Sequence, residues 1–161
     1  MRGMTTSLIL AVAATTFAGC EKYELDRQME ELCKKDGGVQ VYETVQLPAS
    51  RFDSTGRLFT SPAEDKGGGL FVRMVTQDYR IESRTDVIKS GEPFGKRVIS
   101  DGRLLRFRTT VRRVADQRLL GEETSYSRTG GDITLGQPSQ NYCPNPRPIP
   151  DVIQTVFLKG E

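Results

Sequence analysis

Residues 103–118 (RLLRFRTTVRRVADQR) contain six arginines, and their spacing is the strongest chemical signal in this chain. Side chains alternate between the two faces of a β-strand, so a strand here groups three of these arginines on one face: Arg106, Arg108 and Arg112. Guanidinium groups bind phosphate and carboxylate through paired N–H donors. The row therefore predicts a binding site for an anion, such as a lipid headgroup, a lipopolysaccharide phosphate or an acidic partner surface. The alternative is an ordinary solvated face whose charges are balanced locally.

The acidic neighbours of this row depend on how its strand pairs with the following one. A short turn at residues 116–117 would place Thr110 opposite Glu123 and Phe107 opposite Tyr126. Glu123 would then lie within the arginine row and neutralise it in part.

Other catalytic and cofactor signatures are weak or missing. The chain has no histidine, which excludes a histidine-based triad, a histidine general base and a His-ligated metal. Residues 67–69 (GGG) precede a strand and lack the Lys-Ser/Thr of a phosphate-binding loop. There is no Gly-x-Ser-x-Gly elbow and no Ser-x-x-Lys motif. We expect no cofactor. The enzyme alternative is one that processes an envelope polymer with carboxylates from residues 48–69 or 84–94.

Composition narrows the class of protein further. The chain has 161 residues, of which 27% are charged and 36% hydrophobic, as in a rather polar globular protein of one domain. Its 23 Lys+Arg against 21 Asp+Glu give a formal charge of +2. That charge is too small for a dedicated nucleic-acid binder, so no nucleic-acid partner is expected.

Residues 1–20 (MRGMTTSLILAVAATTFAGC) have the layout of an export signal. Arg2 precedes an apolar run that is shorter than the roughly 20 residues of a membrane-spanning helix. Ala18-Gly19-Cys20 resembles the lipobox of bacterial lipoproteins, whose Cys is diacylated and becomes the mature N-terminus. The resemblance implies a signal peptide over residues 1–19 and a single lipid-anchored periplasmic domain over residues 20–161, with Cys20 tied to the membrane. The alternative is an ordinary secretory signal that is cut after Ala18.

The cysteine count agrees with this interpretation. The chain has three cysteines, so an exported form leaves one without a partner. If Cys20 carries lipid, Cys33 and Cys143 remain as an even pair in an oxidising compartment, where a disulfide is expected. Two unpaired buried thiols are the alternative. No Cys-x-x-Cys or Cys/His cluster predicts a zinc site.

The expected elements give an α+β fold with one N-terminal amphipathic helix packed on an antiparallel β-meander. The helix is expected over residues 23–36, where apolar positions repeat at helical spacing. Its apolar stripe consists of Leu25, Met29, Leu32 and Cys33. Strands are expected over residues 39–47, 70–75, 79–83, 87–89, 95–100, 103–114, 119–127 and 152–158, with a hairpin turn at Asp101-Gly102. Residues 48–69 are expected to form a long loop, and the proline-rich residues 136–150 to run extended over the surface.

Residues 23–48 (YELDRQMEELCKKDGGVQVYETVQLP) resemble the start of a family of small, uncharacterised lipoproteins of Gram-negative bacteria and their prophages. The shared features are a lipobox, a helix ending in Leu-Cys-x-x-Asp-Gly-Gly, a strand ending in Val-x-Leu-Pro, and a Tyr-Cys pair, here Tyr142-Cys143. The resemblance implies an envelope lipoprotein with a Cys33–Cys143 bridge and no known activity. Glu21 follows the lipobox Cys where lipoproteins retained in the inner membrane commonly carry Asp, which favours the outer membrane.

Together these features predict a membrane-anchored envelope protein that acts as a non-enzymatic interaction module. Its expected partners are the membrane, through Cys20, and an envelope protein or an anionic envelope component. A carrier of anions or lipids that uses the arginine row is the second functional alternative, beside the envelope-polymer enzyme.

Overall fold

A computed structural model describes residues 21–94, 100–133, 137–148 and 150–160 of the chain. Cys20, the predicted signal peptide and residues 95–99 of the expected strand lie outside the described residues, so lipidation and cleavage stay predictions. None of the helices among the described residues is long and apolar enough to cross a membrane.

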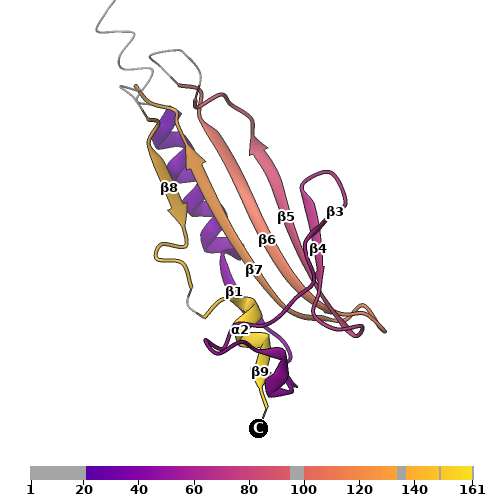
Figure 1. Cartoon of the computed structure of the whole chain (residues 1–161). Coiled ribbons are helices and arrows are strands. Elements are labelled where there is room, and N and C mark those ends of the chain that lie inside the picture. The colour runs from indigo at the N-terminus through magenta and orange to yellow at the C-terminus, as the bar shows by residue number, and fades with distance from the viewer. Residues whose placement is uncertain (1–20, 95–99, 134–136, 149, 161) are drawn as a thin grey trace, which may run out of the picture.

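Three long antiparallel strands form the centre of the fold (Figure 1). They are β5 (Tyr79–Lys89), β6 (Arg103–Arg113) and β7 (Leu119–Thr129). On the β5 side the sheet continues through β4 (Leu70–Met74) and β3 (Glu64–Asp65). On the other side β7 pairs with both β1 (Gly38–Val41) and β8 (Gln140–Cys143). The α+β prediction is therefore confirmed, although the expected strands 79–83 and 87–89 are one continuous strand.

Residues 21–36 are helical and pack across one face of this sheet. The predicted stripe makes the contact: Leu25, Met29 and Cys33 are buried in one apolar cluster with Leu104 and Tyr126, and Leu32 packs at its edge. The burial explains why this segment is a helix in the folded chain, since an isolated helix of this length is marginal in water.

A second apolar cluster lies on the opposite face, beneath the short helix α2 (Val152–Val156). Within this cluster α2 packs closely on Gly121 of β7: a Cβ atom added at this glycine would lie 2.7 Å from Val156 Cγ2. The prediction of a strand over residues 152–158 is wrong for most of its length. Asp151 accepts a hydrogen bond from Gln154 N and begins a helix, and only β9 (Phe157–Lys159) is extended.

The predicted strand over residues 39–47 is divided in two. Tyr42 N and Glu43 N both donate to Leu120 O, which ends the ladder between β1 and β7. The chain then turns away as β2 (Val45–Leu47), which pairs in parallel with β9. The expected loop over residues 48–69 contains a 3-10 turn, η1 (Ala49–Arg51), before β3. The expected extended segment over residues 136–150 contributes β8.

The register between β6 and β7 differs by one residue from the predicted one. Phe107 lies opposite Ser125, and Tyr126 lies opposite Arg106. The five-residue connection (114–118), closed by Arg113 N donating to Arg118 O, places Arg112 opposite Leu119, and a β-bulge between Val111 and Arg112 then leaves a net slip of one residue. Because side chains alternate along a strand, the slip moves Tyr126 to the face that the N-terminal helix covers.

Candidate functional site

The predicted arginine row lies on one face of β6, but each member has an acidic partner. Arg106 Nη2 lies 2.7 Å from Asp86 Oδ2, and the hydrogen bond from this guanidinium is the main reason that the pKa of Asp86 is lowered. Arg108 and Arg112 form longer ion pairs of 3.7 Å, with Asp36 and Glu82 respectively. The row is thus largely neutralised by local acids, but not one for one, because Asp86 and Glu82 each pair with a second arginine, Arg84 and Arg80.

Glu123 does not take the neutralising role predicted for it. The register slip puts it opposite Thr109, on the face that carries α2, where its Oε2 accepts a hydrogen bond from Val152 N at 3.2 Å. The predicted partner of the row therefore supports the start of α2 instead.

A buried polar layer beneath the N-terminal helix was missed by the sequence analysis. Arg128 is 2% exposed and forms a two-point contact with Asp26, with Nε–Oδ1 at 2.8 Å and Nη2–Oδ2 at 3.2 Å. Tyr126 Oη donates to Asp36 Oδ1 at 2.6 Å, and burial followed by this contact raises the pKa of Tyr126 to about 12. These groups join the helix to the sheet and are already satisfied by one another.

The predicted disulfide is confirmed. Cys33 at the end of the helix and Cys143 at the end of β8 are bonded, with their Cα atoms 6.0 Å apart. The bridge fixes the helix to the edge strand of the sheet and closes a sequence separation of 110 positions.

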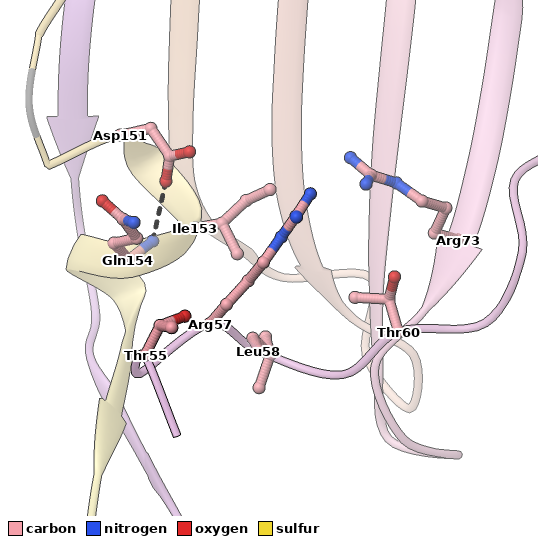
Figure 2. Close-up of a pocket in the computed structure, with 8 residues that line it drawn as sticks. All are labelled: Thr55, Arg57, Leu58, Thr60, Arg73, Asp151, Ile153 and Gln154. Atoms are coloured by element: carbon pink, nitrogen blue, oxygen red, sulfur yellow. Dashed lines mark hydrogen bonds between the residues drawn. The ribbon is translucent and has the colours of Figure 1, made fainter. Parts of the chain in front are cut away.

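Two arginines outside the predicted row line a groove of about 370 Å³ between the loop after η1, strand β4 and helix α2 (Figure 2). The eight residues that line it are Thr55, Arg57, Leu58, Thr60, Arg73, Asp151, Ile153 and Gln154. Figure 2 shows the guanidinium groups of Arg57 and Arg73 extending from two different segments into the same space. The groove therefore gathers cationic groups that are 16 positions apart in the sequence.

The loop that presents Arg57 is held by a local turn. Asp53 Oδ1 accepts hydrogen bonds from Thr55 N, Thr55 Oγ1 and Arg57 N, and the bond from Thr55 is the chief cause of the lowered pKa of Asp53. Gly56 supplies the positive φ of 82° at the tip of the turn. An isolated bridge between Phe52 and Leu58 closes the loop and leaves Arg57 exposed.

Charge in the groove is only partly compensated: the carboxylate of Asp53 interacts electrostatically with Arg57, and Asp151 lies in the lining. Within the described part of the chain, neither Arg57 nor Arg73 forms an ion pair or a side-chain hydrogen bond. The one acidic residue in the lining is Asp151, and its Oδ1 is engaged by Gln154 N at 2.9 Å. A second hollow adjoins the groove, shares Arg73, Asp151, Ile153 and Gln154 with it, and adds both Arg147 and the carboxylate of Glu123. Like charges in the groove repel one another, and a bound anion would reduce that repulsion.

Two carboxylates of the segments considered for an enzyme are engaged in other contacts. Asp53 is held by its own turn, and Asp86 is paired with both Arg84 and Arg106. No group of three or more potential metal-ligating side chains occurs among the residues that the structure describes.

The chain matches no family model, no curated protein and no solved structure. The function must therefore be inferred from the geometry of the groove and from the sequence.

Proposed function

We propose that this protein is a lipid-anchored, non-enzymatic binding module of the bacterial cell envelope, and that it holds an anionic group in the groove between β4 and α2. The observation that supports the binding role is the pair of guanidinium groups, Arg57 and Arg73, which enter one groove and form no ion pair or side-chain hydrogen bond among the described residues. The anchoring role rests on the resemblance of Ala18-Gly19-Cys20 to a lipobox.

The chemistry of the groove suits a phosphate or carboxylate group. Guanidinium groups offer planar pairs of N–H donors that match these oxyanions. The hydroxyls of Thr55 and Thr60 supply further donors in the same lining. The volume of about 370 Å³ is at the lower end of small-molecule sites, which favours a compact ligand or a single charged group of a larger one.

The position of the groove agrees with a membrane anchor at Cys20. Residue 21 lies at one end of the long strands, whereas α2 lies at the other end (Figure 1). The eleven residues of β6 alone span about 34 Å at roughly 3.4 Å per residue. A lipid on Cys20 would therefore keep the groove well away from the membrane surface, facing the periplasm.

Titration with an anion tests the binding role. We would purify the full-length protein in a nonionic detergent and titrate inorganic phosphate and phenyl phosphate by calorimetry. Arg57→Gln and Arg73→Gln should each weaken binding by tenfold or more, because charge-assisted hydrogen bonds are worth about 1.5–3 kcal/mol each. Arg27→Gln is the matched control, since Arg27 is exposed on the helix and its loss changes the net charge equally. If both groove variants bind phosphate as tightly as the unchanged protein, the groove is not the binding site. If only a further variant, Arg108→Gln, loses affinity, the site lies at the arginine row of β6 instead.

Intact-mass analysis tests the anchor separately. The protein isolated from membranes should lack residues 1–19 and carry added acyl mass on Cys20. A chain that begins at Gly19 without acyl mass would instead support the ordinary secretory signal.

A further inference from the structure

The end of the sheet next to residue 21 is fixed tightly to the start of the helix. Glu21 Oε1 lies 2.6 Å from Lys89 Nζ, and Glu21 Oε2 accepts a hydrogen bond from Gly102 N at 3.3 Å. Lys22 N donates to Gly131 O at 3.1 Å, and its ammonium lies 3.4 Å from Asp132 Oδ2. The first residues that the structure describes are therefore bound to both strand connections at this end.

Three large apolar side chains are exposed at the same end, each from a different segment. Tyr23 is 73% exposed, Phe94 68% and Ile133 46%. Tyr23 follows the two tethered residues of the helix, Phe94 lies in the connection between β5 and β6, and Ile133 follows Asp132 in the connection after β7. Pro93 is buried against Gly130, and this contact joins the connection between β5 and β6 to the connection after β7. We call these three side chains the apolar tip.

Chain geometry brings this tip close to the membrane if Cys20 is acylated, a condition that rests on the proposed function. Consecutive Cα atoms are about 3.8 Å apart, so one peptide unit separates the acylated residue from Glu21. Glu21 is already held by Lys89 and Gly102, which leaves no linker between the lipid and the folded domain. A Cys20 whose acyl chains lie in the bilayer must therefore hold this end of the sheet at the headgroup level.

We propose that the apolar tip inserts into the membrane interface and docks the domain with its long strands pointing away from the lipid. Exposed aromatic and aliphatic side chains gain free energy when they leave water, and the headgroup region accepts aromatic rings readily. The occupant of this surface is thus a lipid bilayer. The tip acts as a second membrane contact beside the acyl chains, and it sets the orientation in which the groove faces the periplasm.

A single tryptophan can report on this contact, because the chain has no native Trp. We would prepare full-length Phe94→Trp and reconstitute it in phosphatidylcholine vesicles whose acyl chains are brominated. The matched control is Phe59→Trp, which replaces a ring that is 52% exposed and that lies between Leu58 and Thr60, two residues of the groove lining. Emission from Phe94→Trp should shift to shorter wavelength and be quenched by the brominated lipid, whereas Phe59→Trp should stay open to aqueous iodide.

Equal iodide quenching of the two variants in vesicles would overturn the proposal. A blue shift that depends on protein concentration and is insensitive to brominated lipid would also overturn it, because a second copy would then cover the tip. The proposed function is tested by two other measurements, the acyl mass on Cys20 and the phosphate titration, so its failure can be distinguished from failure of the membrane contact. For protein without acyl mass, the same quenching measured at excess lipid decides whether the tip binds the membrane by itself.

Discussion

Removal of the partly buried carboxylate of Asp26 should strongly destabilise the protein, because its partner Arg128 is buried. Asp26→Ala leaves the guanidinium of Arg128 at 2% exposure without its charge partner, and it also removes the acceptor for Asn141 Nδ2 at 3.0 Å. Breaking a buried ion pair on one side costs about 3–5 kcal/mol. For a domain of this size the loss corresponds to a fall in Tm of roughly 10–20 °C. Urea denaturation followed by circular dichroism measures the change in the free energy of unfolding.

Two variants make this measurement specific. Glu24→Ala breaks the exposed pair with Arg27, whose side chains are about two-thirds exposed (64% and 66%), and it should cost under about 1 kcal/mol. The double variant Asp26→Leu/Arg128→Met should recover much of the lost stability, because no charge is then left buried. If Asp26→Ala cost no more than Glu24→Ala, the polar layer would not be holding the helix on the sheet, and the reasoning would be refuted.

Three further predictions concern stability. Cys143→Ser should lower the free energy of unfolding by about 4–5 kcal/mol, as expected for a closed loop of this length, and thiol titration of a Cys20→Ser form that finds two free cysteines would contradict the bridge. Gly121→Ala should cost about 1–3 kcal/mol in urea denaturation, because the added methyl would meet α2, and a neutral effect would mean that α2 moves freely. The folded-state pKa of Asp86 lies below its unfolded value of 3.8, so its contribution is present above about pH 4 and is lost as the pH falls through the folded pKa. Arg106→Gln should flatten this acid dependence, and an unchanged pH profile would argue against the pair.

Local patterns in the sequence are enough to predict the helix and most of the sheet. The spacing of Leu25, Met29 and Cys33 predicts which face of the helix is buried, and the cysteine count predicts the disulfide. The register of β7 could not be found in the same way, since it depends on a five-residue turn whose Gln117 takes a positive φ of 59°. Helix α2 was missed because residues 152–158 (VIQTVFL) lack a distinct period, although Asp151 was an available capping signal.

The candidate site was harder to predict, because sequence shows where arginines are and not which of them lack partners. Arg106 and Arg108 are neutralised by Asp86 and Asp36, which lie 20 and 72 positions away and meet them only in the folded sheet. Arg57 stands in a loop whose composition suggests nothing more than a turn. Arg57 lines the same groove as Arg73 only because α2 lies close to β4 in the folded chain.

The difference between paired and unpaired arginines separates stability from binding in this fold. Arg106 and Arg128 contact acids on neighbouring segments, so their loss should weaken the fold and affect ligand binding only through unfolding. Arg57 and Arg73 form no ion pair among the described residues, and like charges in one groove repel one another, so replacing either should cost the fold little. Arg57→Gln and Arg73→Gln should therefore leave the urea midpoint unchanged or slightly raised while phosphate affinity falls. Loss of stability and affinity together in both variants would show that the groove arginines are structural.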